Sequence, residues 1–170
     1  ERTPLSADTY SVLAPRALGN LAQSPALKAL RKRGILKAAV RCDRKKMCMK
    51  MKYGAAAGFE VELLRKIAND ALGVKLNIVE EGAPDADVRL NVMCGAPHGP
   101  PQPGAAGKYY AGPYYYSSAT GWLCCEVVNG GQPLADALDR ITEHFYRTGA
   151  FQQAFKNWFI PETPDVERSR

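Results

Sequence analysis

A strand–helix–strand pattern between residues 35 and 79 constrains the fold of this chain more than any other feature. Ile35 to Arg41 (ILKAAVR) is a short, mostly apolar run of the kind that forms buried strands. Gly58 to Leu72 carries apolar residues whose later members recur at helical spacing, and Gly73 closes this helix. Val74 to Val79 is the next strand. Two strands joined by a helix almost always run parallel with a right-handed crossover, so the pattern predicts an α/β fold.

The remaining segments continue this alternation within one folded unit. Ser24 and Pro25 are typical of a helix start, with a capping serine and proline at the first helical position, and Gly34 ends this short basic helix. Further strands are expected at Asp87–Cys94 and Ser117–Val128, and further helices at Leu134–Tyr146 and Ala150–Phe159. We predict an extended N-terminal arm over residues 1–24, a folded unit over 25–160 and a loose tail over 161–170.

Composition and charge exclude several classes of protein. Of the 170 residues, 46% are hydrophobic, which is typical of a globular chain and not of a disordered one. The net charge of +6 suggests an acidic partner surface or simply solubility. Basic residues cluster only at 28–37 and 41–52, without zinc-finger or RNP-type spacing, so nucleic acid is not an expected partner. No apolar run approaches the roughly 20 residues that span a bilayer, so we expect no transmembrane segment.

The sequence contains no catalytic motif. A nucleophile elbow, a P-loop and HExxH are all missing. The two histidines, His98 and His144, have no Ser, Cys or Asp at motif spacing, and we interpret both as solvated or hydrogen-bonded side chains. We therefore expect no enzymatic activity and no cofactor.

Five stretches, in order along the chain, resemble the type II periplasmic solute-binding proteins, the family that includes the amino-acid-binding components of ABC importers. LRKRGILKAAV resembles the opening helix and first strand, and GFEVELLRKIANDALGVKLNIV resembles the GFDVDL helix and second strand. DADVRLNVMCG, GPYYYSS and PLADALDRITEHFYRTGAFQQAFKNWF resemble the third strand, the PYY-S segment and the C-terminal helices. The resemblance covers residues 27–160 and implies a small, mostly parallel sheet flanked by helices.

The resemblance also implies a location. The solute-binding proteins of this family are periplasmic, and the chain begins at Glu1 rather than Met, so we interpret it as an exported protein whose leader has been removed. One subgroup is similar in a further detail. In the binding-protein-like accessory proteins encoded with quinoprotein alcohol dehydrogenases, the third strand runs into a G-x-P-x-G loop and then PYY-SS, as MCGAPHG and GPYYYSS do here.

Two departures from the family concern the architecture. Its members have two lobes, and the second lobe is inserted before the C-terminal helices. Here GWLCCEVVNGGQPLADAL passes across a short turn, which leaves no room for a second lobe. EEGAPDA replaces the helix expected between Val79 and Asp87. We therefore expect lobe 1 alone, with lobe 2 missing.

A third departure concerns the ligand contacts. The family places an aromatic loop after the first strand, and Ser or Thr donors with an arginine after the third strand. This chain has DRKKMCMKMKYG and GAPHGPPQPGAAG at those places, so both halves of the usual ligand grip are missing. Any vestigial ligand site is expected at the carboxyl ends of the strands. Its candidate residues are Cys42, Tyr53, Gly95, His98 and Ser117.

A sulfur-rich basic segment lies within residues 41–57, which we expect to form an irregular loop. Met47, Cys48, Met49 and Met51 are soft ligands of the kind that select Cu(I), so a copper site is one hypothesis. The favoured one is a partner-contact surface, because methionine adapts to irregular interfaces. Its candidates are Lys46, Met47, Met49, Met51 and Tyr53.

A tyrosine-rich run is a second candidate for partner contact. The run KYYAGPYYYSS predicts an exposed aromatic face in which Tyr114, Tyr115 and Tyr116 contact a partner.

The five cysteines form no CxxC pair, so we expect no zinc site. If the sheet follows the family, Cys42 and Cys94 lie at neighbouring strand ends, within reach of a disulfide. Cys48 could pair with Cys124 or Cys125, and the alternative is that several of the cysteines are buried free thiols.

These observations favour a non-catalytic accessory subunit that uses a solute-binding lobe as a docking scaffold in a larger periplasmic complex. The expected partner is another protein subunit, an acidic periplasmic redox protein. One alternative is a minimal module that binds a small periplasmic solute. The other is a small copper-handling protein.

Overall fold

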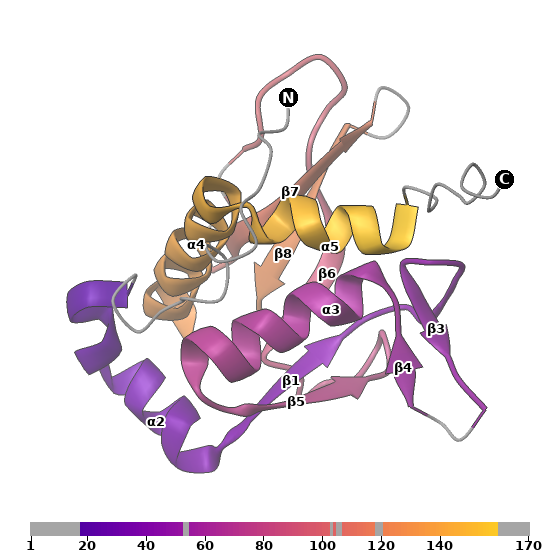
Figure 1. Ribbon diagram of the computed structural model, residues 1–170. Helices are drawn as coiled ribbons and strands as arrows, with labels where there is room; N and C mark the ends of the chain where they lie inside the picture. Colours follow the sequence, from indigo (N-terminus) through magenta and orange to yellow (C-terminus); the bar gives the residue numbers. More distant parts are fainter. Residues whose placement is uncertain (1–17, 53–54, 103, 105–106, 118–120, 160–170) are drawn as a thin grey trace, which may run out of the picture.

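The computed structural model of the chain describes residues 18–52, 55–102, 104, 107–117 and 121–159 (Figure 1). Most of the predicted arm, the predicted tail and Tyr53 lie outside the described residues. The folded unit expected over residues 25–160 is described almost throughout.

The main sheet has five strands in the order β5-β1-β6-β8-β7. The strands are β1 (Ile35–Ala39), β5 (Lys75–Val79), β6 (Val88–Gly95), β7 (Tyr109–Ser117) and β8 (Gly121–Val127). β1 pairs in parallel with both β5 and β6, whereas β8 is antiparallel to β6 and β7. Four of the five strands therefore run in the same direction, which confirms the predicted mostly parallel sheet. The strand expected over 117–128 begins at Gly121, because Ser117 still belongs to β7.

The helices gather on one face of this sheet, as Figure 1 shows. They are the 3-10 helix Gly19–Gln23, α2 (Pro25–Arg33), α3 (Phe59–Arg65) continued by a π-helix (Lys66–Leu72), α4 (Gly131–Thr148) and α5 (Ala150–Phe159). The α2 start follows the sequence pattern, since the Ser24 hydroxyl accepts a hydrogen bond from Leu27 N at 3.3 Å. α3, its π-helical continuation and α4 bury Leu64, Ile67, Leu138 and Phe145, which belong to the hydrophobic core.

The opposite face of the sheet has no helix between β5 and β6. The connection over residues 80–87 is made of turns, as EEGAPDA predicted. β1 to β5 and β5 to β6 cross the sheet in opposite directions, so two right-handed crossovers would lie on opposite faces. Replacement of the second crossover helix by turns therefore leaves one side of β5 and β1 without a covering helix.

The segment expected to be an irregular loop is a small antiparallel sheet, and that prediction is wrong. Its strands are β2 (Asp43–Arg44), β3 (Cys48–Lys50) and β4 (Ala56–Ala57), in that order. Arg44 pairs with Cys48, and Met49 pairs with Ala57. Side-chain alternation in strands of two or three residues is too short to detect in a sequence.

The predicted Cys42–Cys94 disulfide is also wrong. Cys42 bonds to Cys48, with their Cα atoms 4.4 Å apart, and Cys94 bonds to Cys124. The chain leaves the main sheet after β1 and turns into the β2–β3 hairpin, which brings Cys42 back to Cys48. Cys94 instead faces the antiparallel neighbour β8, where Val92 pairs with Cys124. Cys125 is a buried free thiol, so the expected pairing of Cys48 with Cys124 or Cys125 is wrong as well.

These pairings can be checked by peptide mapping without reduction. Trypsin should release a disulfide-linked pair containing Cys42 and Cys48, with Cys94 linked to a peptide that carries Cys124. Burial raises the pKa of the Cys125 thiol, so this thiol should resist alkylation in the native protein and react fully once the chain is unfolded. A Cys42–Cys94 linked peptide would contradict the assignment.

A second prediction concerns the close contact between β7 and α4. A Cβ added at Gly112 would lie 2.6 Å from Thr142 Oγ1 and 2.8 Å from two of its carbons, so Gly112→Ala should lower the free energy of unfolding by about 1–3 kcal/mol. The matched control is Gly82→Ala, where an added Cβ meets no atom within 4 Å and stability should change little. Urea denaturation of both variants measures the difference, and equal midpoints would show that this contact is not tight.

Candidate functional site

The sulfur-rich segment forms the cap of helix α3. We call residues 41–52 the basic hairpin. Phe59 N donates a hydrogen bond to Lys46 O at 2.7 Å, and Glu60 N donates to Met47 O at 2.9 Å. Two of the N–H groups that a helix start leaves unpaired are thereby satisfied by the hairpin backbone. Gly58 permits this approach, because it adopts φ 140° and a Cβ there would lie 2.4 Å from Met47 O.

A buried carboxylate joins the basic hairpin to the main sheet. Glu60, with no exposed surface, accepts hydrogen bonds from Arg44 Nη2 and from Asn91 Nδ2. Arg44 also donates from Nε and Nη2 to Arg41 O, at 3.2 and 3.1 Å. A buried charge is costly unless it is paired and hydrogen-bonded, and here one oxygen of Glu60 receives a cation and the other an amide.

Asn91 reaches Glu60 because β6 is irregular at that point. The register between β6 and β8 shifts between Arg89 and Val92, and Asn91 has a left-handed φ of 61°. Such bulges turn a side chain away from the direction that the strand pleat would give it. The amide of Asn91 is thus directed to the helix side of the sheet, where Glu60 lies.

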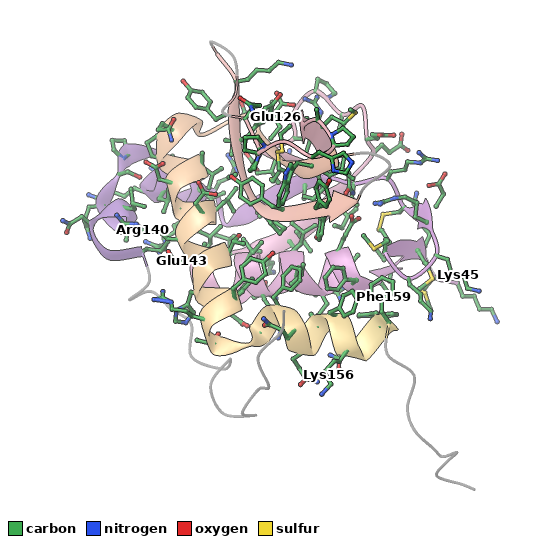
Figure 2. All side chains as sticks on the ribbon, turned by 90° about the horizontal axis from the view of Figure 1, so that it is seen from above. Lys45, Glu126, Arg140, Glu143, Lys156 and Phe159 are labelled. Atoms are coloured by element: carbon green, nitrogen blue, oxygen red, sulfur yellow. A yellow bond between two sulfur atoms is a disulfide. The ribbon has the colours of Figure 1, made fainter. Side chains whose placement is uncertain are left out.

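An open hollow of about 380 Å³ lies beside this ion pair, and we call it the aromatic groove. Its walls are Phe59, Tyr114, Tyr115, Tyr116, Tyr146, Phe151, Phe155 and Phe159, with Arg44, Met47, Asn91 and Leu123 completing the lining. The Phe59 ring meets those of Phe151 and Phe159 edge-on, with centroids 5.4 Å apart. Figure 2 shows Phe159 at the end of α5, on the side of the molecule where Lys45 projects from the hairpin.

Two tyrosines of the groove are held in different ways. Burial, together with the nearby Asp139 carboxylate, raises the pKa of Tyr114 to about 12. Asp139 also accepts a hydrogen bond from Gly112 N at 2.8 Å, which fixes this part of β7 to α4. Burial, then the charge of Glu60, raises the pKa of Tyr115 well above its ordinary value. The Tyr115 hydroxyl is buried and has no hydrogen-bond partner among the described residues.

The predicted vestigial ligand residues do not form one pocket. Cys42 lines a separate depression of about 350 Å³ with Val79, Glu80 and Lys50, in which Gly95 and His98 take no part. His98 N instead donates a hydrogen bond to the Tyr116 hydroxyl at 2.9 Å, which fastens the proline-rich loop to β7. The side chain of Ser117 and all of Tyr53 lie outside the described residues.

The predicted partner-contact residues separate into two surfaces. Met47, Tyr114, Tyr115 and Tyr116 line the aromatic groove, whereas Lys46, Met49 and Met51 lie on the part of the basic hairpin outside the groove. Met51 is 50% exposed.

The copper hypothesis loses one of its four ligands, because Cys48 is buried and bonded to Cys42 and so offers no thiolate. In the described part of the chain, no three His, Cys, Asp or Glu side chains gather as a metal site, and no helix is long and apolar enough to cross a membrane.

Arg44, Glu60, Asn91 and the phenylalanines of α5 are site residues that we did not expect from the sequence. Glu60 falls in the first turn of a helix, where an acidic residue is ordinarily explained by the helix dipole. Asn91 sits inside an apolar strand, and only the bulge explains it. The spacing of Phe151, Phe155 and Phe159 by four residues was the available signal, because it puts three rings on one helix face.

Known structures share this fold. A mutant of the arginine-bound form of domain 1 from TmArgBP aligns with a TM-score of 0.55 and 17% identity, over 71% of this chain and 98% of that one. A mutant of ArgBP from T. maritima gives 0.61 and 13%, over 80% and 100%. A solute receptor for L-cysteine of Neisseria gonorrhoeae gives 0.61 and 12%, over 82% and 98%. No family model and no curated protein matches the sequence.

The fold is therefore that of the type II solute-binding proteins, and specifically of their domain 1, as the sequence resemblance implied. These neighbours are binding proteins and receptors. At 12–17% identity the structural similarity establishes the fold alone, and it does not assign the ligands of these proteins to this chain.

The ion pair beneath the groove gives a stability prediction. Arg44→Gln leaves the Glu60 carboxylate buried with only Asn91 as partner, so unfolding should become easier by about 3 kcal/mol. Arg41→Gln removes an exposed pair with Asp43 and should cost about 0–1 kcal/mol. In the double variant Arg44→Gln, Glu60→Gln the buried charge is gone, and part of the loss should return. Urea denaturation of all three measures this, and equal losses for Arg44→Gln and Arg41→Gln would contradict a structural role for the buried pair.

Proposed function

We propose that this chain is a non-catalytic accessory protein that docks on an acidic surface of a periplasmic protein through the basic hairpin. The observation that carries the proposal is the set of hairpin lysines. Lys45, Lys46 and Lys50 are exposed and form no ion pair in the described part of the chain. The other hairpin cations differ, because Arg41 is paired with Asp43 and Arg44 with Glu60. Figure 2 shows Lys45 extending away from the body of the molecule.

The rigidity of the hairpin supports a docking role. The Cys42–Cys48 disulfide closes it, its backbone carbonyls bind the start of α3, and Arg44 ties it to a buried carboxylate. A surface that is already ordered loses less conformational entropy when it binds. Exposed Met51 adds an adaptable apolar contact beside the lysines.

The fold and the disulfides support the location and the kind of complex. Two disulfides are typical of an oxidising compartment such as the periplasm. The Pro-rich loop and PYY-SS segment resemble the accessory proteins encoded with quinoprotein dehydrogenases, so a redox enzyme is the partner we favour. The lobe then serves as a scaffold, because the Ser, Thr and Arg donors that hold a solute in that family have no counterpart in this sequence.

A second candidate is a minimal solute-binding module. The neighbour described as the arginine-bound form of domain 1 supports it, because that protein is a single domain of this fold with a bound solute. Here the depression near Cys42 is lined by Asp43, Glu80 and Glu81 together with Lys50 and Arg41, which suits a solute carrying both charges. Calorimetric titration with free arginine tests this candidate for one such solute, and absence of binding at millimolar arginine would exclude arginine as its ligand.

The docking proposal predicts a position-specific effect of charge. At low salt the chain should be recovered from its native source as a stoichiometric subunit of a larger assembly. A Lys45→Glu, Lys50→Glu variant should show at least about tenfold weaker association, because each substitution opposes an acidic surface. The matched control, Lys28→Glu with Lys75→Glu, changes the net charge equally on exposed residues outside the hairpin and should stay bound.

Salt gives a second measure of the same contact. Raising NaCl from about 50 mM to about 500 mM should release the wild-type chain, because exposed charges are screened over a few ångströms at high ionic strength. Recovery of a lone monomer at low salt, or equal weakening by both pairs of substitutions, would contradict docking through the hairpin.

A further inference from the structure

We propose that the aromatic groove is a binding site for a small, neutral aromatic molecule that carries a hydrogen-bond-accepting oxygen. This site is distinct from the basic hairpin lysines, and the inference does not depend on the docking proposal.

The size and lining of the groove define the apolar part of the ligand. The hollow of about 380 Å³ falls in the range of small-molecule sites, and an apolar cavity of about 150 Å³ already accepts benzene. Its rings come from α3, α4, α5 and β7, and Phe59 stands edge-on to Phe151, Phe155 and Phe159. Aromatic faces and edges arranged in this way favour another ring over an aliphatic chain.

The polar groups of the groove indicate that its ligand should carry a hydrogen-bond-accepting oxygen. The Tyr115 hydroxyl is buried without a partner among the described residues, and a buried polar group in that state has a hydrogen bond left to make. The Arg44 side chain also lines the groove and is 27% exposed, and a guanidinium has donors only. Glu60 already accepts hydrogen bonds at both oxygens. The groove therefore offers donors, and its natural complement is an acceptor such as a carbonyl oxygen.

The charges around the groove define the net charge of the ligand. Arg44, which lines the groove, is already neutralised by its ion pair with the buried Glu60. Burial keeps the Tyr115 hydroxyl protonated at neutral pH, so it acts as a donor without adding charge. An anionic or cationic ligand would lose its hydration and gain no unpaired opposite charge in return.

The test uses two probes of nearly equal shape, acetophenone with a carbonyl oxygen and ethylbenzene without one. Ligand-observed NMR titration of the full chain should give binding of both, with acetophenone tighter by about tenfold. In Tyr115→Phe this preference should fall to about unity, while the affinity for ethylbenzene stays the same. Tyr115→Phe removes one unpaired hydroxyl and keeps the ring, so the variant should remain folded.

The matched control is Tyr110→Phe, a tyrosine of the same strand that does not line the groove. It should retain the tenfold preference. Intermolecular NOEs from the acetophenone ring to Phe59 or Phe155 should locate the probe. Absence of binding by both probes, NOEs to other residues, or an unchanged preference in Tyr115→Phe would overturn the proposal.

Discussion

The carboxylate of Glu60 connects helix α3 to the basic hairpin and to strand β6. It sits at the first turn of α3, has no exposed surface, and receives Arg44 from the basic hairpin and Asn91 from β6. A buried carboxylate cannot lose either partner without a large cost, so the hairpin, the helix and the bulged strand are held in one arrangement. The Cys42–Cys48 bond and the backbone cap of α3 fix the same hairpin from two other directions. These three sets of bonds hold in place the hairpin that carries the exposed lysines and contributes Arg44 and Met47 to the aromatic groove.

The one-sided placement of helices follows from the short connection between β5 and β6. Turns replace the crossover helix between β5 and β6, so the main sheet carries helices on one face only (Figure 1). The helix face supplies the buried core and the rings of the aromatic groove. What remains is a lobe with the fold of domain 1 of the solute-binding proteins, in which the strand-end residues are divided between the hairpin and the proline-rich loop.

The cysteines show how local geometry overrides a family pattern. Neighbouring strand ends made Cys42 and Cys94 plausible partners, but β1 is only five residues long and the chain turns away after it. A hairpin brings residues six apart into contact, and an antiparallel pair brings Cys94 to Cys124. Both contacts are set by strand pairing, which the spacing of cysteines in a sequence does not reveal.

The sequence by itself determined the main architecture, because strands, helices and their caps depend on neighbouring residues. Ser24, Pro25, Gly34 and Gly73 mark helix ends where the structure has them, and EEGAPDA correctly indicated a lost helix. Only the tertiary structure decided which side chains meet. Glu60 is bonded to Asn91 because a strand bulge redirects the Asn91 side chain. The ring of Tyr115 packs against Phe151 of α5, which lies about 40 residues further along the chain. Such contacts depend on packing between distant segments, so no local pattern predicts them. The segment of methionines and lysines is accordingly part of a small sheet whose backbone caps α3, and its lysines Lys45, Lys46 and Lys50 remain exposed.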